Sequence, residues 1–112
     1  MKTKLLIATA MIGLALPAAA DFTTVQLAYE VALSEVRLPR IENGTIAFKE
    51  CEDCDYKTKR VSANIRYLVD GRSVSLSKFR QMTDRVADRN KEAVTILHHL
   101  EDNRVTEVSV YL

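Results

Sequence analysis

The pair Asp70-Gly71 constrains the fold strongly, because it joins two segments with β-strand composition. Residues 60–69 (RVSANIRYLV) are rich in β-branched and aromatic side chains, and residues 72–75 (RSVS) follow the pair directly. Asp-Gly suits a two-residue type I′ turn, in which both central residues have positive φ. The sequence therefore predicts a β-hairpin across residues 60–75.

Period-two alternation of apolar residues predicts further strands. Residues 25–33 (VQLAYEVAL) are apolar at every odd position, which favours a strand, although the same segment also presents an apolar helical face. Residues 45–48 (TIAF) predict a short strand. Residues 94–101 and 105–112 alternate in the same way around Asp102-Asn103, which predicts a second hairpin.

The apolar period changes to 3.6 over residues 76–90, which predicts one amphipathic helix. Ser75 or Ser77 can cap its first turn. One apolar stripe on one helix is what a helix packed on a sheet requires. We therefore expect an α+β fold, with an antiparallel sheet of about five or six strands and the helix packed on one face. The apolar arc of the helix comprises Leu76, Phe79, Met82, Thr83, Val86 and Ala87.

Residues 1–20 (MKTKLLIATAMIGLALPAAA) have the three parts of a secretory signal peptide: two early lysines, an apolar run and a small-residue end. The apolar run is shorter than the roughly 20 residues that a membrane-spanning helix needs. Cleavage between Ala20 and Asp21 would leave residues 21–112 as a single small domain. The signal predicts a bacterial protein that is periplasmic or secreted.

The net charge of the mature chain argues against a nucleic-acid partner. Residues 1–20 hold two of the sixteen basic residues and none of the fifteen acidic ones, so the remainder carries a formal charge of −1. We expect no membrane association after signal cleavage and no cofactor. The expected partner is a protein or small molecule, with a homodimer through strand-edge pairing as a further expectation.

The two cysteines, Cys51 and Cys54, form a C-x-x-C motif that allows three interpretations. In a thiol–disulfide redox protein, one thiolate would be the nucleophile. Four carboxylates surround the motif and disfavour a thiolate, and no amphipathic helix follows it as in a thioredoxin-like setting. These carboxylates belong to Glu50, Glu52, Asp53 and Asp55.

Zinc or copper binding is the second interpretation. Two thiolates at this spacing supply half of a closed four-ligand site. The remaining ligands would come from His98 or His99 and a carboxylate. As neighbours on a strand, the two histidines point to opposite faces, so only one could join the cysteines.

A structural disulfide is the interpretation that we favour, because exported cysteines meet an oxidising environment and their number is even. Phosphate-cradling loops and other enzyme motifs are absent from the sequence. We therefore expect a non-catalytic binding or structural module with a Cys51–Cys54 disulfide. The acidic side chains of this turn would form a recognition surface.

Overall fold

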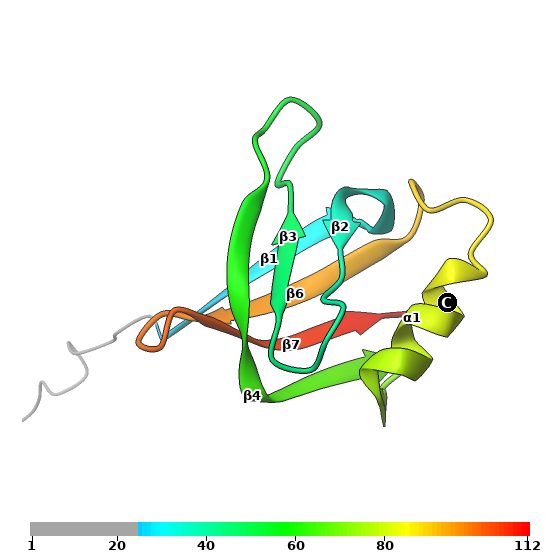
Figure 1. Ribbon diagram of the computed structural model, residues 1–112. Helices are drawn as coiled ribbons and strands as arrows, with labels where there is room; N and C mark the ends of the chain where they lie inside the picture. The colour runs from blue at the N-terminus through cyan, green and yellow to red at the C-terminus, as the bar shows by residue number, and fades with distance from the viewer. Residues whose placement is uncertain (1–24) are drawn as a thin grey trace, which may run out of the picture.

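The computed structural model describes residues 25–112. The predicted signal peptide and its cleavage site between Ala20 and Asp21 lie outside this range. The described chain is mostly β-structure, with one short α-helix, α1 (Leu76–Asp84), and one 3-10 turn, η2 (Leu33–Glu35) (Figure 1). Its strands are β1 (Gln26–Ala32), β2 (Val36–Arg37), β3 (Thr45–Phe48), β4 (Lys57–Val69), β5 (Arg72–Val74), β6 (Ala93–His99) and β7 (Arg104–Val110).

The seven strands form one mixed sheet in the order β1-β6-β7-β4-β3-β2, with β5 paired to β4. Every pairing is antiparallel except that of β4 with β7, which is parallel. The predicted antiparallel sheet is therefore wrong. β4 and β7 are neighbours in the sheet but not in the sequence, because β5, α1 and β6 lie between them along the chain. This long connection lets β7 run parallel to β4.

The sheet is folded over on itself by β4, which is thirteen residues long. Its first residues pair with β3, and its last residues pair with both β5 and β7. Between Val61 and Arg66 the register with β7 shifts. Within this bend the backbone N–H of Asn64 donates to the hydroxyl of Ser62 at 3.2 Å. The result is a curled half-barrel in which β2 and β3 cross in front of β1 and β6 (Figure 1).

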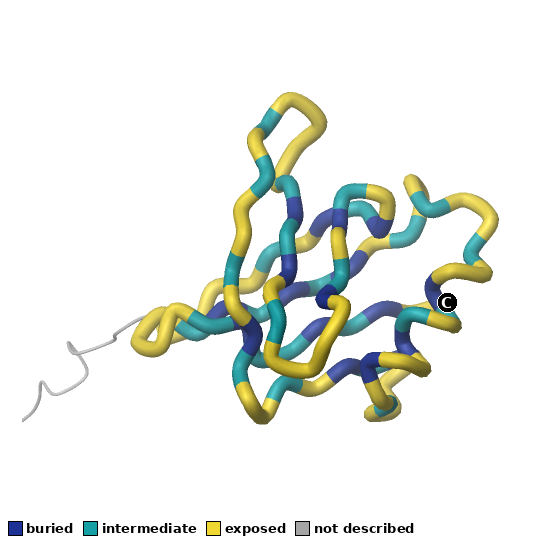
Figure 2. The backbone as a smooth tube through the Cα atoms, viewed as in Figure 1, coloured by how far each residue is buried: buried dark blue, intermediate teal, exposed yellow. Residues whose placement is uncertain are grey.

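The buried residues of the core alternate with less buried ones along β3 and β6, and Figure 2 shows the buried positions spread over the strands of the half-barrel. Ile46 and Phe48 of β3 are fully buried. The Phe48 ring lies 4.9 Å, centroid to centroid, from that of Tyr29 on β1, a favourable tilted aromatic contact between the two layers. The predicted strands at 25–33 and 45–48 are confirmed.

The predicted second hairpin is also present as β6 and β7, but its alternation is interrupted. Val105 and Val108 are both buried, although residues three apart on a regular strand face opposite sides. A register shift lets Leu97 pair with Glu107 while His98 pairs with Val105, so Thr106 is an extra residue. This β-bulge brings both valines to the core.

Helix α1 ends at Asp84, six residues before the predicted end at Asn90. Ser75 caps its start as predicted, accepting a hydrogen bond from the Lys78 N–H at 3.1 Å. The helix ends where the Arg89 guanidinium donates to the Thr83 carbonyl at 2.7 Å. The same carbonyl also accepts from the Val86 N–H at 3.2 Å, so two donors satisfy it after the last helical turn.

The α+β prediction is thus wrong, because one short helix does not form a layer on a flat sheet face. Phe79 of α1 is buried, with its ring centroid 5.4 Å from that of Tyr67 at the C-terminal part of β4. The helix lies at one end of the curled sheet (Figure 1). Within residues 25–112, no helix is long and apolar enough to cross a membrane.

Candidate functional site

The β3–β4 loop holds both cysteines and projects from one end of the half-barrel (Figure 1). Cys51 and Cys54 are joined in a disulfide, as the sequence predicts, with their Cα atoms 5.1 Å apart. The Cys54 N–H also donates to the Cys51 carbonyl at 3.2 Å. The covalent bond and the hydrogen bond therefore close the same tight turn.

Lysines hold the base of this loop. Lys57 donates to the Glu50 carboxylate at 3.0 Å, and this hydrogen bond raises the pKa of Lys57 above its ordinary value. Lys49 donates to the Glu52 carbonyl at 3.3 Å and lies 3.7 Å from the carboxylate of Glu35. The loop is therefore tied to β4 at its base and closed by the disulfide at its tip.

The four predicted recognition carboxylates fall into two groups. Glu50 is paired with Lys57. Glu52, Asp53 and Asp55 are exposed, and none of them forms a salt bridge within the described part of the chain. The loop thus presents three negative charges without salt-bridge partners beside the turn that the Cys51–Cys54 disulfide closes.

The two histidines lie at the β6–β7 turn. His98 is 5% exposed, and its Nε2 lies 2.8 Å from the Asn103 Oδ1. His99 lies on the opposite face, with its Nδ1 3.6 Å from a carboxylate oxygen of Asp102. Asn103 has a positive φ of 56°, a conformation that asparagine tolerates well in a tight turn. The hydrogen bond between His98 and Asn103 therefore stabilises the β6–β7 turn.

The structure does not bring the cysteines and histidines together. Among residues 25–112, the one cluster of three potential metal ligands consists of His99, Glu101 and Asp102, and it contains neither cysteine. With their sulfurs joined, Cys51 and Cys54 offer no thiolate to a metal or a substrate unless the bond is first reduced. The loop is therefore a turn closed by a disulfide.

A second surface, which the sequence did not reveal, covers the outer face of β2, β3 and the first half of β4. It is an open hollow of about 730 Å³. The small side chains of Thr45, Ala47 and Thr58 form its floor, because these positions face away from the buried Ile46 and Phe48. Arginines surround this floor. We call the site the arginine hollow, and its four arginines are Arg37, Arg40, Arg60 and Arg80.

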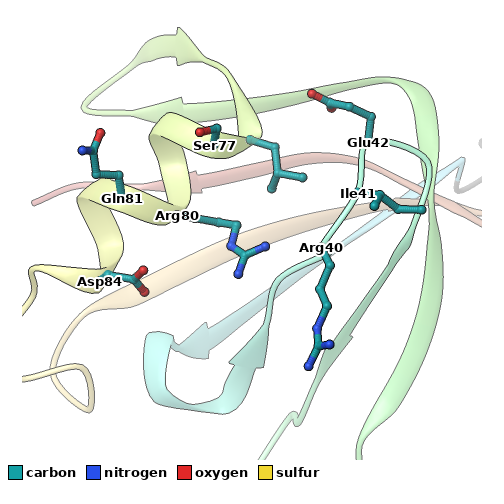
Figure 3. A pocket seen from close by; sticks show the side chains of 8 residues that line it. Arg40, Ile41, Glu42, Ser77, Arg80, Gln81 and Asp84 are labelled. Atoms are coloured by element: carbon teal, nitrogen blue, oxygen red, sulfur yellow. The ribbon is translucent and has the colours of Figure 1, made fainter.

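Two of these arginines are held in place by contacts that leave donors free. The Arg37 guanidinium carbon lies 4.0 Å from the centroid of the Tyr56 ring, a cation–π contact. Arg80 reaches from α1 and donates one N–H to the Pro39 carbonyl at 3.2 Å. Figure 3 shows Arg80 directed from the helix toward the loop that carries Arg40. A guanidinium has five N–H donors, so each retains further donors for a ligand.

A smaller hollow of about 490 Å³ adjoins the arginine hollow between α1 and residues 40–42 (Figure 3). Both hollows share Arg40, Ile41 and Arg80. The smaller one is also lined by Glu42 and Asp84, so acidic groups are confined to that side. Arg37 and Arg60 line the arginine hollow alone, whereas Arg40 and Arg80 lie between the two hollows.

Sequence reasoning missed the arginine hollow because its arginines come from distant segments. A formal charge near zero describes the whole domain and hides local grouping. One signal was available: the strand register places Arg37 beside Ala47 and Arg60 beside Thr45, so a correct pairing of β2, β3 and β4 would have put these residues on one face. No known protein family, curated protein or solved structure matches this chain.

Proposed function

We propose that this chain is a small exported, non-catalytic binding module in which the Cys51–Cys54 disulfide is structural. The observation that carries the proposal is the disulfide itself, which closes an exposed turn whose base is already tied to β4. Disulfides persist in oxidising compartments such as the periplasm or the extracellular space. The predicted signal peptide, cleaved between Ala20 and Asp21, supplies the route to such a compartment.

The local charge supports a structural role over redox catalysis. A catalytic C-x-x-C pair needs a stabilised thiolate, which cations or a helix N-terminus usually provide. Here Glu52, Asp53 and Asp55 surround the sulfurs, and the segment that follows is strand β4. Reduction would place a thiolate among these negative charges, so the disulfide form is favoured.

The proposed mode of action is recognition through exposed surfaces. The three free carboxylates of the β3–β4 loop suit a positively charged partner. Strands β1 and β2 are the two ends of the strand order, and Val25 and Leu27, at the β1 end, are 44% and 40% exposed. Pairing of β1 with a second copy would cover such an edge and remains our proposal for self-association.

Intact mass of the exported protein tests both parts of this proposal. We expect a chain that begins at Asp21 and takes up alkylating reagent only after reduction. Full alkylation without reductant would overturn the structural disulfide. A redox catalyst would instead show a reduction potential well above about −300 mV, the region below which structural disulfides lie.

A matched pair of variants separates structure from catalysis. Cys51→Ser alone leaves a free Cys54, whereas Cys51→Ser/Cys54→Ser removes both thiols. If the disulfide is structural, the double variant should stay folded. Neither the wild type nor the variants should catalyse thiol–disulfide exchange. Measurable disulfide reduction by the wild type, lost in the double variant, would contradict the proposal.

A further inference from the structure

We propose that the arginine hollow binds a phosphoryl-bearing anion. This inference rests on the proposed binding function and deepens it by naming a ligand class, but it uses a surface whose lining residues do not include the disulfide. The juxtaposition that carries it is four arginines around a floor of small polar and apolar side chains. The two tests are independent, since the disulfide test can fail while the anion test succeeds.

The arginines of the hollow lack anionic partners. Within residues 25–112, none of the four has a carboxylate oxygen within 4.0 Å. By contrast, Arg66 on the other part of β4 pairs with Glu107. Among the described residues, the hollow is lined by four arginines and no carboxylate, so it carries an excess of positive charge, which a bound anion would offset. The charge of the hollow therefore favours binding of a negatively charged ligand.

The contacts of Arg37 and Arg80 favour binding by limiting their motion. Tyr56 lies against the Arg37 guanidinium, and the Pro39 carbonyl accepts from Arg80. Ordering a long side chain costs binding free energy, so arginines already held by such contacts lose less on binding. Arg40 and Arg60 are exposed and free to close over the ligand.

The number of guanidinium groups indicates the class of anion. A carboxylate has two oxygens and is satisfied by one bidentate arginine. A phosphoryl group presents three or more oxygens and up to two charges, and planar arginine forks match it well. Asn43, Thr45 and Thr58 line the same hollow and can donate to the remaining oxygens. Several arginines around one hollow therefore fit a phosphoryl anion better than a single carboxylate.

The phosphoryl group could belong to a soluble compound or to a lipid headgroup. Ile41, which borders the hollow, is 67% exposed and would contact the apolar part of a bilayer in the second case. The chemistry recognised by the arginines is the same in both. Vesicles and a soluble probe distinguish the two sources.

Calorimetry with inorganic pyrophosphate at about 100 mM salt tests the soluble source, since this ionic strength screens weak surface attraction. Cosedimentation with phosphatidylglycerol vesicles tests the headgroup source. We expect saturable binding that weakens about tenfold or more in Arg40→Gln and in Arg60→Gln, because each removes a charge-assisted hydrogen-bond donor. Arg72→Gln, at an exposed arginine on β5 outside the hollow, should bind as the wild type does.

Amide chemical shifts of the wild-type protein provide a second measurement that needs no variant. Titration with pyrophosphate should shift the resonances of Thr45, Ala47 and Thr58 more than those of residues on β6.

Binding to vesicles alone, weakened by Arg60→Gln and by Ile41→Ser, would assign the headgroup source and support the proposal. Binding to pyrophosphate with no effect of Ile41→Ser would assign a soluble source and also support it.

Three results would overturn the proposal. The first is no binding of either probe by the wild type. The second is an equal loss in Arg72→Gln, which would mark nonspecific attraction. The third is saturable binding of polyglutamate without binding of pyrophosphate or vesicles, which would show that the ligand of the hollow is an acidic peptide and not a phosphoryl anion.

Discussion

The carboxylate of Asp70 accepts a hydrogen bond from the backbone N–H of Leu112 at 2.8 Å. In the same place the Asp70 N–H donates to the Val110 carbonyl at 2.9 Å. One turn residue of the β4–β5 hairpin therefore holds the end of β7 through both its side chain and its backbone. The φ of Asp70 is 53°, so this residue must also tolerate the left-handed region.

Asp70→Ala should lower the free energy of unfolding by about 1–2 kcal/mol, because it removes the hydrogen bond to Leu112 and places alanine at positive φ. Asp70→Asn keeps an acceptor oxygen and a residue that tolerates positive φ, so its effect should be much smaller. Urea denaturation of both variants measures the difference. Equal destabilisation by the two substitutions would contradict this account.

Gly71 has a φ of +83°, and a Cβ built on it would meet no atom within 4 Å. Gly71→Ala should therefore destabilise through backbone strain alone, by about 1 kcal/mol. Gly71→Asn, with a residue better suited to positive φ, should recover part of this loss. Thermal unfolding compares them, and an unchanged midpoint for the alanine variant would disprove the strain.

Tyr67 is 2% exposed, and its hydroxyl has no hydrogen-bond partner among the described residues. Tyr67→Phe removes this unsatisfied group and should raise the free energy of unfolding by about 1 kcal/mol at neutral pH. Tyr111→Phe is the matched control, since Tyr111 is 72% exposed and should show no change. A destabilised Tyr67→Phe would mean that the hydroxyl has a partner.

The stability of the wild type should also fall at alkaline pH through Tyr67. Burial, followed by the nearby charge of Glu42, raises the pKa of Tyr67 from 10.0 to about 12. The unfolded chain loses this proton first, so the folded state loses relative stability as pH rises from 10 to 12. The advantage of Tyr67→Phe should grow over that range, as denaturation at several pH values will measure.

Removing the disulfide should cost little. For a loop this short, the chain-entropy relation gives about 2 kcal/mol for Cys51→Ser/Cys54→Ser. The ties from Lys49 and Lys57 remain, so the sheet should stay folded. Chemical denaturation measures the loss, and reduction of the wild type should reproduce it. Unfolding of the double variant in native buffer would show that the loop does more than close a turn.

Local chemistry made individual turns, caps and strands predictable, although the fold class was wrong. The Asp70-Gly71 turn has positive φ at both residues, and the Ser75 cap lies where its hydroxyl predicts. The disulfide followed from spacing and number. In each case the residues that decide the structure are within a few positions of one another.

The features that were missed depend on distant residues. The parallel pairing of β4 with β7, and the register shift between Val61 and Arg66, join segments that are far apart in the sequence, so no local pattern reports them. The early end of α1 is accompanied by a hydrogen bond from Arg89 to the Thr83 carbonyl, which the apolar periodicity of residues 76–90 does not report. The arginine hollow needs β2, β3, β4 and α1 to be in place before its charges meet.

The strand order also has a consequence for the sequence of events in folding. Among residues 25–112, β1 pairs only with β6. During synthesis β1 therefore has no strand partner until β6, the second-to-last strand of this range, has been made. Closing a loop of that length costs entropy before any hydrogen bond is gained. A nascent chain can therefore form the β4–β5 hairpin early, but it cannot close the half-barrel until β6 is available. The half-barrel should therefore remain incompletely folded for most of the synthesis of the chain.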